Sequence, residues 1–203
     1  CYLPAHLPGQ AVQEVQASMP HKLHSDALGH RILELSFDQF PALAQKTVTL
    51  GASLQLTEAG AELRESIRAA DWLDPERYIE SDAPEIIALA GQLKRPDRRD
   101  CARAIFEWVR DNIAYAGYVA EDVGALRALQ SRRGDCTEYA DLVAALARAN
   151  GIPARMVGGY VTDRDIAPRP QDYHNWTELY LDGAWHVVDA QKGNWLAPRW
   201  QYI

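Results

Sequence analysis

The 203-residue sequence has few cysteines, no cluster of basic residues and no long apolar run. Its three cysteines are too few for a framework of paired disulfides. The net charge of -7, with no basic stretch beyond pairs such as Arg98-Arg99, argues against nucleic acid as a partner, because phosphate binding needs a concentrated basic face. No apolar run approaches transmembrane length, so we do not expect the chain to span a bilayer. The remaining composition, 47% hydrophobic and 24% charged, is typical of a globular protein.

The sequence begins at Cys1 rather than at a methionine. A mature bacterial lipoprotein begins with a lipidated cysteine followed by a flexible polar tether, and residues 2–25 have the Pro, Gln and His content and the weak periodicity of such a tether. An arbitrary cut of the chain is the alternative, and the sequence favours neither. Lipidation of Cys1 would attach the protein to a membrane in the periplasm or cell envelope, and without it we expect a cytoplasmic protein.

The order of sequence patterns predicts an α+β fold in three parts. Residues 29–37 and 45–56 alternate as strands do, and we expect them to form an antiparallel pair. Helical patterns follow, and strand-like patterns return after residue 153, which is the order of an α+β protein. We predict a leader or tether over residues 1–28, a β-rich extension over 29–70 and a core over 71–203.

Cys136 lies at the start of a predicted helix, directly after Gly134 and Asp135. The helix is expected to end near Asn150, where Gly151 follows. A structural cysteine usually lies within an apolar run, whereas the first turn of a helix has unpaired N–H groups and a dipole that favours negative charge. This position therefore stabilises a thiolate, although Asp135 opposes it unless its carboxylate caps the helix. Cys101, within another amphipathic helix, is predicted to be a helix-surface or half-buried residue with no chemistry.

A cysteine nucleophile needs a base, and the base needs a group that orients it. His174 begins one predicted strand and Asp189 ends the next, with a tight turn at Asp182-Gly183 between them. Pairing about this turn brings His174 close in register to Asp189 or its neighbour, so both side chains can point to one face. The chemistry then assigns Cys136 as nucleophile, His174 as general base and acid, and Asp189 as the orienting group.

Residues 134–161 and 174–190 together resemble the transglutaminase-like superfamily of cysteine-triad proteins. The shared pattern is a Gly-x-Cys helix start, a Gly-Ile-Pro-Ala-Arg strand entry, His-x-Trp and Trp-x-x-x-Asp, and its elements here are Gly134/Cys136, Gly151–Arg155, His174/Trp176 and Trp185/Asp189. The resemblance runs from about Trp72 to Asp189. It implies a papain- or transglutaminase-like core of helices packed on an antiparallel sheet, with Cys136, His174 and Asp189 as the catalytic triad.

The resemblance also implies an oxyanion hole. One donor would be the backbone N–H of Cys136, and the second would come from an upstream aromatic residue. Tyr115 is the candidate and Tyr118 the reserve, with ordinary packing at a helix end as the alternative for Tyr115.

The activity implied is that of a thiol enzyme acting on an amide bond of a protein or peptide through a thioacyl intermediate. We expect water to resolve this intermediate, as in a protease or amidase, because the additional domains of animal cross-linking enzymes are not recognisable. Transfer to an amine, as in a transglutaminase, is the alternative, and a non-catalytic scaffold of the same fold is a further one that the intact Cys, His and Asp argue against. We expect no cofactor and no metal: the scattered histidines before residue 31 and the two aspartates of residues 162–165 are poor ligand sets.

Overall fold

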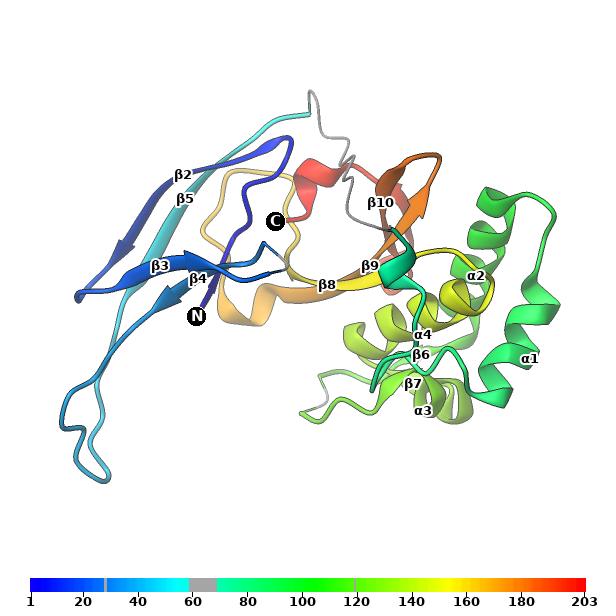
Figure 1. Ribbon diagram of the computed structural model, residues 1–203, viewed down its shortest axis with the longest axis horizontal. Coiled ribbons are helices and arrows are strands. Elements are labelled where there is room, and N and C mark those ends of the chain that lie inside the picture. The colour runs from blue at the N-terminus through cyan, green and yellow to red at the C-terminus, as the bar shows by residue number, and fades with distance from the viewer. Residues whose placement is uncertain (28, 59–68, 119) are drawn as a thin grey trace.

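Figure 1 shows two differently built regions in this computed structural model, which describes residues 1–27, 29–58, 69–118 and 120–203. An N-terminal arm, the described part of residues 1–56, is built of strands, and helices packed on an antiparallel sheet form the core. The described strands are β1 (Tyr2–Leu3), β2 (Gln10–Ala17), β3 (Lys22–Ser25), β4 (Arg31–Glu34), β5 (Leu50–Leu56), β6 (Ala114–Tyr115), β7 (Arg133–Gly134), β8 (Ala154–Tyr160), β9 (Tyr173–Leu181), β10 (Ala184–Asp189) and β11 (Asn194–Ala197). The described helices are α1 (Pro84–Leu93), α2 (Arg98–Asn112), α3 (Gly124–Ser131) and α4 (Cys136–Ala149), with short 3-10 turns η1 (Ala69–Trp72), η2 (Pro170–Asp172) and η3 (Arg199–Gln201).

The strands of the N-terminal arm pair in a different order from the one predicted. β4 pairs antiparallel with β1 and β3, while β5 pairs with β2. The prediction that residues 29–37 pair with residues 45–56 was therefore wrong, although both segments contain a strand. Residues 59–68 of the extension predicted over residues 29–70 lie outside the described residues.

The tether predicted over residues 1–28 instead contains β1, β2 and β3. A register shift just after Val12 explains why the alternation is hidden in the sequence. It places Val12 opposite Leu54 and Val15 opposite Ala52, so two valines three residues apart take neighbouring positions on one face. The extra residue interrupts the period of two that identifies a strand.

Helix α4 runs through the centre of the core. Leu142, Val143 and Leu146 are fully buried, and almost every other side chain of the helix is buried as well. Helices α1, α2 and α3 pack on α4, and strands β8 and β9 pack on it from the sheet. Gly151, just beyond the helix, has a φ of 75°, the left-handed conformation that ends helices. The predicted start at Cys136 and end near residue 150 are confirmed.

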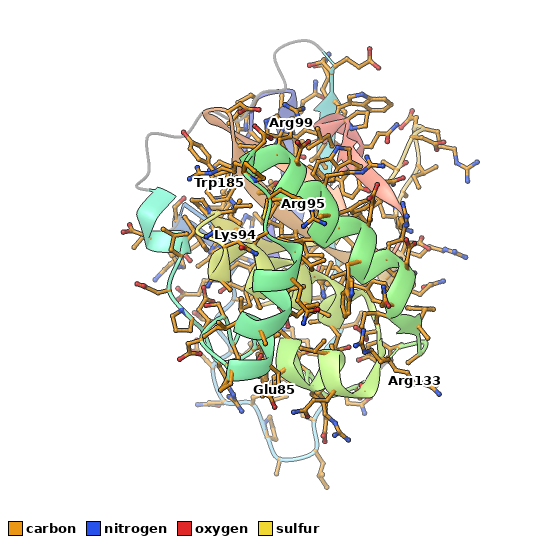
Figure 2. All side chains as sticks on the ribbon, turned by 90° about the vertical axis from the view of Figure 1, so that its right-hand side faces the viewer. Glu85, Lys94, Arg95, Arg99, Arg133 and Trp185 are labelled. Atoms are coloured by element: carbon orange, nitrogen blue, oxygen red, sulfur yellow. The ribbon has the colours of Figure 1, made fainter. Side chains whose placement is uncertain are left out.

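The outer helices cover the core on the side that Figure 2 shows. Helices α1 and α2 lie in front there, and Lys94, Arg95 and Arg99 gather where the two helices meet. On the inner side of α2, Cys101 is 3% exposed within the apolar core, which is deeper than the surface or half-buried position predicted for it. Within the described parts of the chain, no helix has the length and apolar character needed to cross a membrane.

The core sheet carries the second half of the predicted triad. Its order is β11-β10-β9-β8, and all neighbours are antiparallel. Leu181 pairs with Ala184, and Asp182 and Gly183 between them have φ values of 53° and 84°, as a two-residue type I′ turn requires. The predicted hairpin and the α+β class are therefore confirmed, and the start of β9 and the end of β10 lie at the same end of the hairpin.

Candidate active site

The first turn of α4 is held by a capping box. The Asp135 carboxylate accepts a hydrogen bond from the Thr137 N–H at 2.8 Å, and the Glu138 carboxylate accepts one from the Asp135 N–H at 2.9 Å. Asp135 thus caps the helix, which is the alternative that the sequence left open for its carboxylate. Gly134 is required before it, because a Cβ there would lie 2.4 Å from the Glu138 Cβ. Cys136 is therefore fixed at a helix N-terminus.

His174 lies between Cys136 and Asp189. Its Nε2 atom is 2.8 Å from Asp189 Oδ2, and its ring also forms a hydrogen bond with the Cys136 side chain. Since Nε2 is used by Asp189, Nδ1 is the ring nitrogen available to the sulfur. His174 is 6% exposed and Asp189 1% exposed, so the imidazole and carboxylate are shielded from water. The structure brings together all three residues that the sequence singled out.

The surroundings of His174 favour its charged form. Burial lowers the pKa of His174, but hydrogen bonds with Asp189 and Cys136, together with their negative charges, outweigh burial and raise the pKa to about 9. At neutral pH the imidazole therefore carries two protons. A neighbouring imidazolium and a helix N-terminus both stabilise a thiolate.

Sequence reasoning missed Tyr202 and Asn194. The Tyr202 hydroxyl donates to Asp189 Oδ2 at 3.0 Å and accepts a hydrogen bond from the Asn194 side chain at 2.9 Å. The Lys192 N–H donates to Asp189 Oδ1 at 3.0 Å. Tyr202 lies beyond the motifs, directly after the 3-10 turn η3, so neither periodicity nor spacing points to it.

An aromatic contact and a hydrogen bond between β9 and α4 hold His174 in place. Trp176 is 2% exposed and stacks on His174 with ring centroids 6.5 Å apart. The Asn175 side chain donates to Thr137 Oγ1 at 2.8 Å and so ties β9 to the first turn of α4. Gly158, opposite Asn175, has no room for a side chain, because a Cβ would lie 2.1 Å from the Tyr173 hydroxyl.

The remaining predicted site residues lie at the surface. Tyr115 pairs through its backbone with Gly134, next to the head of α4, and its side chain is 56% exposed. Tyr118 is 86% exposed. Cys1 is exposed, and its amino group donates to the Leu33 carbonyl at 2.9 Å. The roles given to Tyr115 and Cys1 stay predictions.

In the parts of the chain that the structure describes, no group of three or more His, Cys, Asp or Glu side chains could hold a metal ion.

Comparison with known proteins gives the class of the molecule. Residues 87–190, half of the chain, match the model of the transglutaminase-like superfamily, and the chain belongs to this superfamily. The kyphoscoliosis peptidase of Homo sapiens is 30% identical over 105 residues, which are 46% of this chain and only 16% of that protein. The matched region thus spans a small part of that relative.

Two solved structures share the fold. A proposed cysteine protease from Cytophaga hutchinsonii is 22% identical, with a TM-score of 0.71 over 98% of this chain and 71% of the other. The periplasmic domain of TgpA from Pseudomonas aeruginosa is 19% identical, with a TM-score of 0.51 over 91% of this chain and 66% of the other. At these identities the likeness shows the fold alone.

Proposed function

We propose that the protein is a thiol hydrolase that cleaves amide bonds of a protein or peptide substrate. Cys136 is the nucleophile, His174 the general base and acid, and Asp189 the group that orients His174. The observation that carries the proposal is the position of His174, buried and hydrogen-bonded to Asp189 on one side and to Cys136 on the other.

The reaction follows from this arrangement. The Cys136 thiolate attacks the amide carbonyl, and the developing oxyanion accepts a hydrogen bond from the Cys136 N–H at the head of α4. Protonated His174 gives its proton to the leaving amine as the C–N bond breaks, which leaves a thioacyl enzyme. Neutral His174 then takes a proton from water, the resulting hydroxide attacks the thioester, and the carboxylic acid departs with regeneration of the imidazolium–thiolate pair. Tyr115, next to Gly134, is the proposed second oxyanion donor.

Hydrolysis is favoured over amine transfer by the relatives. The human relative is named a peptidase, and the first structural relative is proposed to be a cysteine protease. Both names describe attack by water on a peptide bond.

Alkylation of Cys136 tests the nucleophile. We expect iodoacetamide at about pH 6.5, where an ordinary thiol is almost fully protonated, to modify Cys136 at least about tenfold faster than a free thiol such as glutathione. Peptide mass spectrometry would follow Cys136, with buried Cys101 as an internal control. His174→Ala should abolish the advantage, whereas His186→Ala, a matched change in the same hairpin, should keep it. A rate equal to that of glutathione and insensitive to His174→Ala would favour the scaffold and reject the enzyme.

The acceptor is tested by the mass of the product. The enzyme is incubated with a mixture of denatured proteins, with and without a primary amine. New peptide carboxylates in the presence of the amine support hydrolysis. Peptides that carry the amine instead, and that disappear with Cys136→Ala, would replace hydrolysis by amine transfer.

A further inference from the structure

The segment of residues 198–203 lies against the core sheet and contacts Asp189 of the triad. Arg199 donates to Glu178 Oε1 at 2.5 Å and to the Trp185 carbonyl at 3.2 Å, and both side chains of the ion pair are buried. Ile203 pairs with Tyr160 through two backbone hydrogen bonds. The segment is therefore fixed at both ends to the core sheet, one end on β9 and β10 and the other on β8.

Strand β8 has a glycine at the point where the 198–203 segment approaches it. Gly159 lies opposite His174, and a Cβ there would lie 1.9 Å from the Ile203 carbonyl oxygen and 2.9 Å from the Trp176 ring. Only glycine allows the 198–203 segment to approach the strand this closely. Glycine is therefore required at position 159, the second glycine of the "VGGY" stretch, and the sequence pattern alone did not reveal this requirement.

Between its two fixed ends, the segment places the hydroxyl group of Tyr202 against Asp189. Tyr202 is 2% exposed, and its ring packs edge-on against Trp176 at a centroid distance of 5.0 Å. Asn194, paired with Asp189 across β10 and β11, donates to the Tyr202 oxygen and so leaves the hydroxyl hydrogen for Asp189 Oδ2. Oδ2 is the same oxygen that contacts His174 Nε2.

We infer that Tyr202 is a positioning residue of the triad, which holds the Asp189 carboxylate in the one orientation that presents Oδ2 to His174. A carboxylate can rotate about its Cβ–Cγ bond. The Lys192 N–H donates to Oδ1 and the Tyr202 hydroxyl donates to Oδ2, so both carboxylate oxygens are held independently of His174. Tyr202 does not touch the reacting atoms. It acts through Asp189, and this inference rests on the proposed role of the triad.

Tyr202→Phe removes the hydroxyl and keeps the ring against Trp176. The titratable groups around the imidazole are Cys136 of α4, Asp189 of β10 and Tyr173 next to His174 on β9. With the Tyr202 hydrogen bond to Oδ2 removed, the Asp189 carboxylate is held only by the Lys192 N–H and His174 itself, so it orients the imidazolium less firmly. The fast alkylation of Cys136 should therefore be lost at a lower pH than in the wild type. We expect a rate near neutral pH reduced about tenfold, as removal of an orienting hydrogen bond can cause.

Tyr139→Phe is the matched control. It also removes one buried tyrosine hydroxyl, which donates to the Ile113 carbonyl, but that hydroxyl is not bonded to Asp189. Alkylation rates of the wild type and both variants are measured across pH, together with their melting temperatures. A shifted pH profile in Tyr202→Phe alone supports the inference. A pH profile equal to the wild type's overturns it, even if the melting temperature falls, because the role would then be structural.

The outcomes separate this inference from the proposed function. Slow alkylation of Cys136 in the wild type itself would reject the triad. Fast alkylation in the wild type with an unchanged Tyr202→Phe profile would reject the positioning role alone.

Discussion

Two aspartates are buried to the same degree in two regions of the core, and their surroundings differ. Asp189 at the end of β10 is 1% exposed, and Asp141 in the middle of α4 is 2% exposed. Asp189 accepts hydrogen bonds from His174, Tyr202 and the Lys192 N–H. Oδ2 of Asp141 has no hydrogen-bond partner among the described residues. Partners rather than depth decide what a buried carboxyl group does.

The difference appears in the protonation of Asp141. Burial, together with the nearby negative charges of Glu138, Asp122, Glu80 and Glu76, raises its pKa to about 8. At neutral pH Asp141 is therefore largely a neutral acid inside the helical layer. Asp189 instead accepts hydrogen bonds from the His174 imidazolium and from two further donors, the Tyr202 hydroxyl and the Lys192 N–H. The same side chain serves as packing in one region and as part of the proposed machinery in the other.

The largest effect is expected from Asp189→Ala. The change leaves three donors without an acceptor, two of them buried side chains, which should lower the free energy of unfolding by about 3 kcal/mol and slow the alkylation of Cys136 about 100-fold. Urea unfolding and peptide mass spectrometry measure the two effects. Asp141→Asn, in the other region, should leave the alkylation rate unchanged. Equal rates in wild type and Asp189→Ala would show that the two aspartates do not differ in role.

An effect on stability alone, with no change in the alkylation rate, is expected from Asp141→Asn through the pH dependence of unfolding. The pKa of Asp141 is raised from 3.8 in the unfolded chain to about 8 in the folded one. Between these values the folded state binds the additional proton, so the stability from this group is fully present below 3.8 and is lost as the pH rises to about 8. Asn has no such proton.

The measurement is urea unfolding of both proteins at several pH values. The wild type should lose stability relative to Asp141→Asn across this window, and the variant should be the more stable one at the alkaline end. A constant difference between the two would contradict the assigned protonation.

The smallest effect concerns the pH at which fast alkylation ends. The pKa of His174 is raised from 6.5 to about 9, so its imidazolium contributes fully below 6.5 and is lost as the pH rises through about 9. The alkylation rate of Cys136, divided by that of a free thiol ionised to the same extent, should therefore fall by several-fold above about pH 9. The ratio should not vary with pH in His174→Ala. A ratio that is equally flat in the wild type would contradict the imidazolium–thiolate pair.

Local chain geometry made part of this site predictable. A turn at Asp182-Gly183 fixes the register of β9 on β10, and that register alone brings His174 near Asp189. Likewise, a Gly-Asp-Cys sequence before an apolar run predicts both the helix start and the cap. The hairpin register and the helix start depend on residues that are close in sequence, so a local pattern is enough to predict them.

Features that depend on distant segments were not predictable. Tyr202 reaches Asp189 only because Arg199 and Ile203 fix its segment on other strands. The pairing of β2 with β5 depends on a bulge whose position no local pattern reveals. Pairings of this kind are decided by the packing of the whole fold rather than by propensity.

The two-residue turn at Asp182-Gly183 lies at the far end of the hairpin from the triad. Inserting one residue there would shift β10 against β9 by a single step and reverse which face each of its side chains takes. Asp189 would then point away from His174, with every residue of the triad still present. A change of length in this turn would thus separate Asp189 from His174 as completely as a mutation of either residue.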